Sequence, residues 1–430
     1  IVESPTKSKT ISKYLGKDFL VRAAVGHVRD LPKSNKKAID IKGGFIPKYE
    51  ISEGKKPILE DLGNIAKKAE EIYLATDPDR EGEAIAWHVS EVLGLKKPKR
   101  IVFHEITKEA VKEALEHPRG IDSGLVKAQE ARRVLDRLVG YDLSGLIWKK
   151  VRYGLSAGRV QSPALRIIVE REREIRAFKS EAYYIITATV HGKNEKVFIV
   201  TCEEEPKSKQ VVETIIKTGQ TGSWFVKDIT ENEVKRSPRA PFTTSTMQQT
   251  ASSRLGFSPS RTMLIAQKLY EQGFITYMRT DSVNIASSAK TQILSLIEKK
   301  YGKEYAQPRT YQTTSKNAQE AHEAIRPTEV SHTPQSIEQY LDRNQFRLYD
   351  LIWRRATATQ MAPAELNATI INIASDKNYT FRANGQTIVF DGWLKIYPAA
   401  QRESILPELA EGEKVDLATL DPIPHFTEPP

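Results

Sequence analysis

A short apolar run that passes through a dense acidic turn into a helix is the feature that most constrains this chain. Ile72 to Thr76 have the composition of a buried strand, and the seven residues that follow, Asp77 to Glu83, include four acids. Apolar residues then recur at helical spacing, at Ala84, Ile85, Trp87 and Val89. A strand, a polar turn and a helix in this order predict an α/β sheet with functional groups at the carboxyl ends of its strands.

The same order of elements opens the chain. Ile1 and Val2 form a short apolar strand, and Ser4-Pro5 then marks a helix start, because serine caps the first turn and proline fits the first helical position. The helix is expected to close near Gly16. Together the two units predict an α/β domain over residues 1–120.

Beyond residue 120 the predicted secondary structure changes from helical to β, then back to helical and again to β. Residues 121–178 are helical and strongly basic, which indicates a separate helical unit. Residues 179–236 contain an alternating β pattern at Tyr183 to Thr201, and residues 363–430 repeat a β-hairpin pattern, from Leu366 to Ile373 and then past the turn-type pair Asn384-Gly385 to Ile396. The two stretches are assigned to one β-rich domain. The helical residues 237–362 between them form an inserted domain, which is expected to swing as a unit because it is joined at two adjacent points.

Composition narrows the class of protein. A length of 430 residues favours roughly two to four domains, and a net charge of +10 suits a polyanionic partner, although a merely basic surface stays open. The chain lacks an apolar run long enough to span a membrane, and the single cysteine, Cys202, excludes an internal disulfide framework or a cysteine zinc site and favours a reducing cytoplasm. Since it starts at Ile1 and stops at Pro430, it is expected to be a fragment.

Three carboxylates alternate directly after the second predicted strand, at Asp77, Asp79 and Glu81. An extended loop would point two or three of them toward one place, and Glu3 at the end of the other strand is expected to join them. Hard oxygen ligands of this kind suit Mg²⁺. The alternative is a solvated acidic turn that caps the following helix.

Lys7 lies in the first turn of the Ser4-Pro5 helix, where backbone amides and the helix dipole favour an anion. A lysine there can protonate a leaving oxygen or neutralise a phosphate. An ordinary surface lysine is the alternative.

Tyr277 follows a helix announced by Ser258-Pro259 and ended by Gly273, and Arg279 shares its face of a short extended stretch. A tyrosine oxygen can attack phosphorus, and a neighbouring arginine can balance the charge of the transition state. A Tyr-x-Arg pair by itself is equally consistent with ordinary strand residues.

Several basic and polar residues are candidates for contacts with DNA. Some lie in the helical unit, where a salt-bridged surface is the alternative, some in the turn before a Ser-Pro helix start, and some in the inserted domain, where a structural histidine is the alternative. The predicted DNA contacts are Arg80, Arg132, Arg133, Asp136, Arg159, Gln161, Ser162, His322 and Arg326.

Five of these motifs occur together in an order that resembles the type IA DNA topoisomerases, and the methionine after Tyr277 is similar to the bacterial DNA topoisomerase I branch. The motifs are Glu3-Ser4-Pro5-x-Lys7, Asp77-x-Asp79-Arg80-Glu81-Gly82-Glu83, Ser156-Ala157-Gly158-Arg159-Val160-Gln161-Ser162, Tyr277-Met278-Arg279-Thr280-Asp281-Ser282 and His322-Glu323-Ala324-Ile325-Arg326-Pro327-Thr328.

The resemblance implies a multidomain α/β plus α plus β fold. It would contain a Rossmann-like Toprim domain, an incomplete helical DNA-binding domain, a β-rich arch and a helical domain with the catalytic tyrosine, arranged as a torus. In the family the helical domain is completed by chain beyond the returning β segment, often followed by zinc ribbons, so activity of this piece alone is an open question.

The resemblance also implies chemical roles. Tyr277 would become linked to a 5′ phosphate, Arg279 would stabilise the phosphate, Lys7 would protonate the leaving 3′ oxygen, and Glu3 would assist acid and base steps. Asp77, Asp79 and Glu81, with Glu3, would bind Mg²⁺. The expected activity is ATP-independent relaxation of negatively supercoiled DNA by a monomer in the bacterial cytoplasm, associated with the nucleoid, and the chain has no P-loop motif.

Several alternatives stay open from the sequence. Within the family they are a topoisomerase III-type decatenase and the topoisomerase portion of a reverse gyrase. Outside it they are a Toprim nuclease or primase, which would use the carboxylates without the tyrosine, and a non-enzymatic DNA-binding protein.

Overall fold

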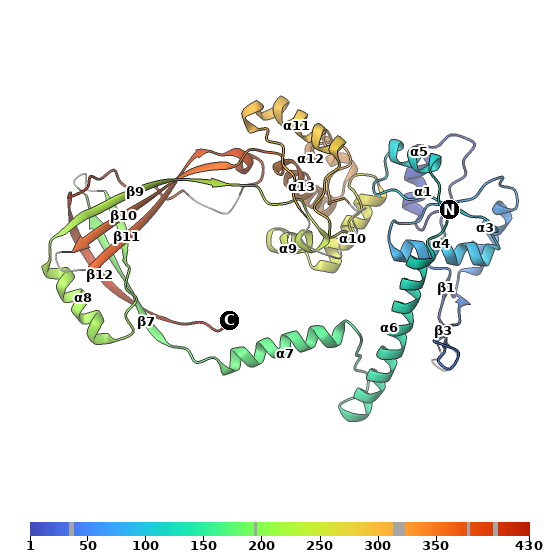
Figure 1. Cartoon of the computed structure of the whole chain (residues 1–430), viewed down its shortest axis with the longest axis horizontal. Coiled ribbons are helices and arrows are strands. Elements are labelled where there is room, and N and C mark those ends of the chain that lie inside the picture. The colour runs from blue at the N-terminus through green and yellow to red at the C-terminus, as the bar shows by residue number, and fades with distance from the viewer. Residues whose placement is uncertain (34–37, 193–195, 313–322, 376–378, 399–402) are drawn as a thin grey trace. The chain divides into compact units, whose positions relative to one another are not determined.

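The structure, a computed structural model, describes residues 1–33, 38–192, 196–312, 323–375, 379–398 and 403–430 (Figure 1). The chain divides into two compact units. Unit 1 comprises Ile1–Ala164, Arg239–Tyr301 and Pro308–Gln360, and unit 2 comprises Leu165–Pro238, Gly302–Gln307 and Met361–Pro430. Residues from three of the four predicted domains thus gather in unit 1, and the finer four-domain division stays a prediction.

The N-terminal part of unit 1 is the expected α/β domain. Its helices are α1 (Pro5–Ser12), α3 (Lys56–Ala66), α4 (Arg80–Leu93) and α5 (Lys108–Glu116). Its paired strands are short: β5 (Tyr73–Leu74) lies parallel to β6 (Lys99–Arg100), β1 (Arg29–Asp30) pairs with β4 (Glu50–Ile51), and β2 (Ile39–Asp40) pairs with β3 (Ile46–Pro47).

Two boundaries in this domain differ from the sequence prediction. The first helix ends at Ser12, before Gly16, and the regular part of the strand predicted over Ile72 to Thr76 spans Tyr73–Leu74. The predicted strand at Ile1 and Val2 is a single parallel bridge between Val2 and Ala23. Apolar side chains from α3, β5 and α4 pack into one core, which fixes the start of α4 above the end of β5.

The basic helical segment forms α6 (Ser123–Lys150) and α7 (Gln161–Ala177). Asp122 caps α6, accepting hydrogen bonds from the amides of Gly124 and Leu125 at 2.8 and 3.1 Å. Because α7 begins at Gln161, Ser162-Pro163 lies inside its first turn instead of preceding it. Among the described residues, no helix is both long and apolar enough to cross a membrane.

The inserted helical domain contains α9 (Thr244–Leu255), α10 (Pro259–Glu271), α11 (Ser287–Tyr301), α12 (Pro334–Ile337), a 3₁₀ turn η2 (Glu338–Tyr340) and α13 (Arg343–Ala358). Ser258 caps α10 as predicted, and Gly273 takes a φ of +82° directly after it, a conformation that favours glycine. The chain then forms two isolated bridges, Phe242 with Ile325 and Ile275 with Pro327. These bridges hold the segment before Tyr277 against the segment that contains Arg326.

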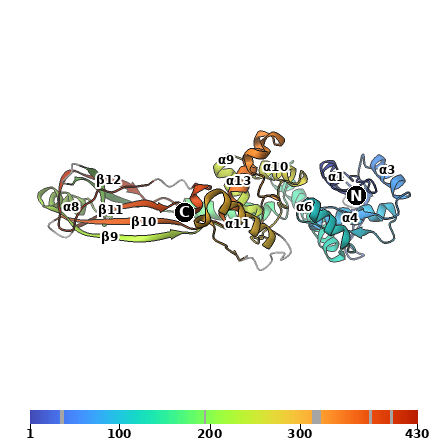
Figure 2. The ribbon, with the colours of Figure 1, turned by 90° about the horizontal axis from the view of Figure 1, so that it is seen from above.

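Unit 2 is a closed barrel with the strand order β10-β11-β8-β7-β12-β9. The strands are β7 (Ala182–His191), β8 (Val197–Cys202), β9 (Trp224–Arg236), β10 (Ala364–Ser375), β11 (Tyr379–Phe390) and β12 (Lys414–Phe426). Helix α8 (Lys209–Thr221) lies at one end of the barrel (Figure 2), and its Val212 and Ile215 belong to the barrel core. The 3₁₀ turns η1 (Lys303–Tyr305) and η3 (Gly392–Lys395) complete the unit.

One local prediction in this unit was wrong. Asn384-Gly385 does not form a hairpin turn; both residues lie inside β11, where they pair with Ile370 and Thr369 of β10. A Cβ on Gly385 would come within 2.6 Å of Leu406, so close packing explains the glycine better than turn geometry does.

Candidate active site

The acidic loop between β5 and α4 is shaped by its own backbone. Asp79 is the N-cap of α4 and accepts a hydrogen bond from the amide of Gly82 at 2.8 Å. A Cβ on Gly82 would lie 2.1 Å from the carbonyl oxygen of Asp77, so only glycine lets the helix start this close to the loop.

A buried arginine that belongs to none of the predicted motifs anchors the same loop. The guanidinium of Arg100 donates to the carbonyl oxygens of Leu74, Thr76 and Asp77 at 3.1, 2.9 and 2.7 Å. Its charge is balanced by Glu83, whose carboxylate accepts from Arg100 Nε at 3.0 Å. The end of β5 is therefore fixed by a satisfied, charge-assisted network.

Lys7 is a core residue of this site and not a surface lysine. It is 0% exposed, and its Nζ lies 3.0 Å from Glu3 Oε1 and 3.0 Å from Asp77 Oδ1. The ammonium also lies 5.1 Å from the ring centre of Phe103 and 5.7 Å from that of Tyr270. Burial opposes its charge, but the two carboxylates outweigh this and raise the pKa of Lys7, which holds it as a cation.

The two carboxylates beside Lys7 differ in character. Burial raises the pKa of Glu3 to about 8, even though Lys7 opposes the shift. Burial also acts to raise the pKa of Asp77, but the Lys7 charge outweighs it and the pKa of Asp77 is lowered. At neutral pH, Glu3 is thus a proton donor next to an ionised aspartate.

Tyr277 reaches the acidic loop from the inserted domain. Its hydroxyl donates to Asp79 Oδ2 at 2.7 Å, and Arg279 Nη1 donates to the same oxygen at 3.2 Å. The Tyr277 amide donates to the carbonyl oxygen of His104 at 2.8 Å, and Tyr270 packs edge-on against the Tyr277 ring. Burial, then Asp77 and Asp79, raise the pKa of Tyr277, so the phenol is protonated in this arrangement.

The three predicted metal carboxylates have different partners. Asp77 faces Lys7, Asp79 faces Tyr277 and Arg279, and Glu81 Oε2 lies 3.3 Å from His27 Nε2 and accepts from Gln129 Nε2 at 3.2 Å. Across the described ranges of the chain, no three His, Cys, Asp or Glu side chains are gathered closely enough to hold a metal ion. The loop supplies the carboxylates that were expected, without converging them on one point.

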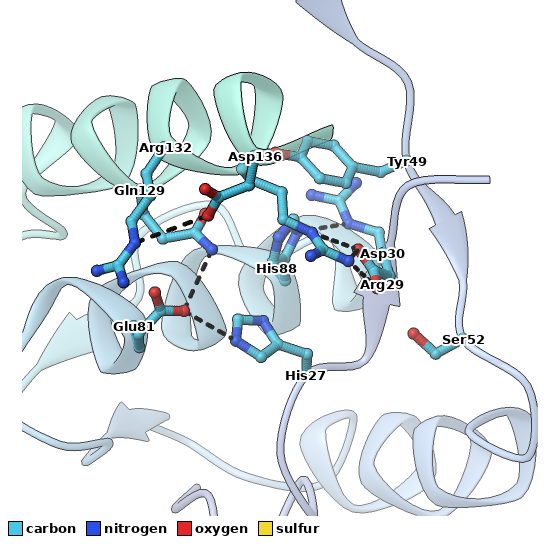
Figure 3. Close-up of a pocket in the computed structure, with 11 residues that line it drawn as sticks. His27, Arg29, Asp30, Tyr49, Ser52, Glu81, His88, Gln129, Arg132 and Asp136 are labelled. Carbon is cyan, nitrogen blue, oxygen red and sulfur yellow. Dashed lines mark hydrogen bonds and ion pairs between the residues drawn. The ribbon is translucent and has the colours of Figure 1, made fainter. Parts of the chain in front are cut away.

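A cavity of about 340 Å³ opens beside Glu81, between the α/β domain and α6 (Figure 3). Its lining is strongly polar, and Arg29 contributes a buried Nη2 atom that has no hydrogen-bond partner in the described structure. The residues that line it are His27, Arg29, Asp30, Tyr49, Ser52, Glu81, His88, Gln129, Arg132, Arg133 and Asp136.

The predicted DNA contacts fall into separate places. Arg132 and Arg159 both pair with Asp136, with N···O distances of 3.9 and 2.7 Å, so the structure joins the helical unit to the Gly158-Arg159 turn. Arg133 instead pairs with Asp30 of the α/β domain at 2.6 Å. Gln161 and Ser162 are exposed, as is Arg80 at the first position of α4.

The two predicted contacts of the fifth motif differ in status. His322 lies outside the described residues. Arg326 is 4% exposed and donates its hydrogen bonds to protein groups. A DNA contact through this guanidinium would require those bonds to break.

An α/β acidic loop that receives a tyrosine and an arginine from a second domain is an arrangement suited to an enzyme that acts on phosphate esters. A family model described as DNA topoisomerase matches residues 120–430, and a Toprim-domain model matches residues 1–106. The structure is similar to full-length topoisomerase I from Thermotoga maritima, with 39% sequence identity, a TM-score of 0.87, and coverage of 100% of this chain and 72% of that chain.

The chain therefore belongs to the type IA DNA topoisomerases, in the bacterial topoisomerase I group. It is an isomerase that relaxes DNA by transient cleavage of a strand. The family and the multidomain α/β, α and β fold expected from the sequence are confirmed.

Proposed function

We propose that Tyr277 is the nucleophile that cuts one strand of negatively supercoiled DNA and becomes linked to its 5′ phosphate. The observation that carries this is the hydrogen bond from Tyr277 Oη to Asp79, at 2.7 Å. The oxygen attacks phosphorus, its proton passes to the Asp79 carboxylate, and the bond from phosphorus to the 3′ oxygen breaks. Arg279, beside the tyrosine, stabilises the negative charge that develops on the phosphate.

The leaving 3′ oxygen needs a proton, and Lys7 and Glu3 are the donors. Lys7 hydrogen-bonds Glu3 at 3.0 Å, and Glu3 is itself protonated at neutral pH because burial raises its pKa to about 8. A proton given up by Lys7 can thus be replaced from Glu3. Resealing reverses each transfer: the 3′ hydroxyl attacks the phosphotyrosine, and Tyr277 takes its proton back from Asp79.

The phosphotyrosine keeps the energy of the broken phosphodiester, so resealing needs no ATP. Because Tyr277 and Asp79 come from different domains, separation of these domains after cleavage would open a gap between the two DNA ends. The covalent link retains the 5′ end while a second strand passes through.

We further propose that the acidic loop holds Mg²⁺. The donor set fits the ion, because Asp77, Asp79 and Glu81 offer carboxylate oxygens, with Glu3 adjacent. Magnesium would supply positive charge that neutralises phosphate oxygens. In the structure cationic or hydrogen-bonding groups face each carboxylate, so binding is expected to displace contacts such as that of His27 with Glu81.

The strand next to the cut is proposed to follow the cavity beside Glu81. Arg132, Arg133 and the orphaned Nη2 of Arg29 offer positive groups there, and Arg159 extends the same surface. Such a site takes a single-stranded segment, which negatively supercoiled DNA provides. We propose a monomer that acts in the bacterial cytoplasm, at the nucleoid.

Relaxation of a negatively supercoiled plasmid tests this function. The chain is expected to relax the plasmid with Mg²⁺ and to stop when the metal is chelated, and isothermal titration should detect Mg²⁺ binding that Asp77→Asn/Asp79→Asn removes. A protein that nicks plasmid without becoming attached to it would instead be a Toprim nuclease, which contradicts the role of Tyr277.

A further inference from the structure

One buried arginine joins the Toprim domain to the domain that carries Tyr277. The guanidinium of Arg326 donates from Nε and Nη2 to Glu323 at 2.9 and 2.7 Å, and from Nη2 to Glu105 Oε2 at 2.8 Å. Glu323 belongs to the same domain as Arg326, whereas Glu105 lies in the Toprim domain between β6 and α5. Within unit 1, one cation therefore bridges the two halves of the active site.

The arginine is tied to the nucleophile by the backbone. Arg326 N donates to Thr276 Oγ1 at 2.9 Å, and Thr276 N donates to the Arg326 carbonyl oxygen at 2.9 Å. Thr276 directly precedes Tyr277. On the opposite side, the Tyr277 amide donates to His104, the residue before Glu105. The ion pair and the nucleophile thus approach the same short segment of the Toprim domain.

Arg326 is held more firmly by Glu323 than by Glu105, so its contact with Glu105 can break while its contact with Glu323 persists. Glu323 holds Arg326 by two hydrogen bonds and also accepts from the Ala286 amide at 2.6 Å. The Glu105 side chain is 24% exposed against 5% for Arg326. If the domains part, Arg326 keeps a carboxylate and Glu105 passes into water, so no charge is left buried and unpaired, which is the main penalty of breaking such pairs.

Burial also makes Glu105 the weaker side of the bridge. It raises the pKa of Glu105 above the ordinary value, although Arg326 opposes the shift. Part of the attraction to Arg326 therefore offsets the loss of water around Glu105, as expected for a contact that forms and breaks in each cycle.

We propose that Glu105 and Arg326 form a releasable latch that holds the Toprim domain against the tyrosine domain for cleavage and resealing. The proposal rests on the function proposed for Tyr277, because the latch acts on the gap between the two domains. Glu105 is a positioning residue: it touches no reacting atom, and it brings the 3′ end held by the Toprim domain back to the phosphotyrosine. A weaker latch should slow resealing more than cleavage.

Glu105→Gln tests the latch, since it removes the charge and keeps the shape. Glu105→Asp retains the charge and serves as the conservative variant, and Glu113→Gln, on an exposed position of α5, is the matched control. Variants of Arg326 are avoided because they would strand Glu323 in the interior.

Opening is measured by single-molecule fluorescence transfer between dyes at Lys68→Cys in the Toprim domain and Ser252→Cys on α9, both exposed positions. Cys202→Ala removes the native thiol. The DNA-free protein is measured first, and the covalent complex with a single-stranded oligonucleotide second. Resealing is timed separately, after addition of high salt.

Glu105→Gln is expected to raise the open fraction about tenfold in both states and to slow resealing by a similar factor, with cleavage changed less than about twofold. Glu105→Asp should behave mostly like the wild type because it retains the charge, and Glu113→Gln should match the wild type. An open fraction of Glu105→Gln equal to wild type, or equal losses of cleavage and resealing with a lower melting temperature, would overturn the latch.

The two proposals fail in different ways. Absence of any covalent adduct with the wild-type protein would contradict the function proposed for Tyr277. The open fraction of the DNA-free protein would still test the latch. An adduct that forms normally, with no change in opening, would contradict the latch alone.

Discussion

The hydroxyl of Tyr277 donates a hydrogen bond to Asp79 at 2.7 Å across 198 residues of sequence. The two side chains come from the inserted domain and the Toprim domain, and each is positioned by local structure: Asp79 by its capping of α4, Tyr277 by the His104 carbonyl. Their contact assembles the active site, and it is also the contact that must break when the two domains separate after cleavage.

Asp79→Asn should slow cleavage strongly, because an amide keeps the hydrogen bond to Tyr277 but cannot take its proton. We expect a loss of at least about a hundredfold in the single-turnover rate of oligonucleotide cleavage at saturating Mg²⁺. Asp61→Asn, an exposed position on α3, is the control. An unchanged rate for Asp79→Asn would show that another group accepts the proton.

Gly82→Ala should disable the acidic loop, since its Cβ would lie 2.1 Å from the Asp77 carbonyl oxygen and the loop must move. Plasmid relaxation is expected to fall by more than about tenfold. Gly145→Ala, on α6, meets no heavy atom within 4 Å and should relax plasmid like the wild type. Equal activity of the two variants would mean that the loop tolerates displacement.

Lys7→Met should destabilise unit 1, because it leaves Glu3 and Asp77 buried without their shared cation. The expected loss is about 3 kcal/mol in the free energy of unfolding, measured by urea titration. Adding Asp77→Asn to Lys7→Met should recover part of the stability, since it removes the carboxylate charge that the lost lysine leaves unpaired. A double variant less stable than Lys7→Met would refute this explanation.

His88 should make the Toprim domain sensitive to acid. It is buried, and its Nδ1 accepts a hydrogen bond from Arg29 Nε at 3.0 Å, so burial and then the arginine charge lower the pKa of His88 to about 3. The unfolded chain takes up this proton near pH 6.5, so the stability is fully present above that pH and is lost as pH falls toward 3.

At pH 5 the expected contribution of His88 to this loss is about 2 kcal/mol. Urea unfolding of the wild type and of His88→Gln at pH 7.5 and pH 5 measures it, and only the difference between the two pH values is compared. The wild type should lose more stability than His88→Gln. Equal losses of stability in the two proteins would contradict this, because they would mean that the folded protein holds a protonated His88 without penalty.

Sequence reasoning found the parts of the site that recur as local patterns. Ser4-Pro5 predicted the start of α1, and the alternating acids predicted a loop at the end of β5. The partners of these residues could not be predicted from local patterns, because they come from tertiary contacts between distant segments. Arg100 ends a basic run that begins at Lys96, and only the folded chain shows that it holds the Asp77 backbone.

The same limit explains the errors. Asn384-Gly385 has turn chemistry, yet packing against Leu406 places it within β11. The ion pair of Arg133 with Asp30 of the Toprim domain was likewise not foreseen, because helical spacing shows only the acids of its own helix, and the DNA contact of Arg133 stays a prediction. Glu105 carried no motif at all. Its only signal in the sequence is its place just after the apolar run Ile101 to Phe103.

The most direct test of the account is to map the covalent bond. The wild-type protein is mixed with a single-stranded oligonucleotide and Mg²⁺, denatured, digested, and the DNA-linked peptide is identified by mass spectrometry. The account predicts a 5′-phosphotyrosine on Tyr277, and no adduct from Tyr277→Phe, which should still bind the oligonucleotide with nearly unchanged affinity. An adduct on another residue, or one that persists in Tyr277→Phe, would contradict it.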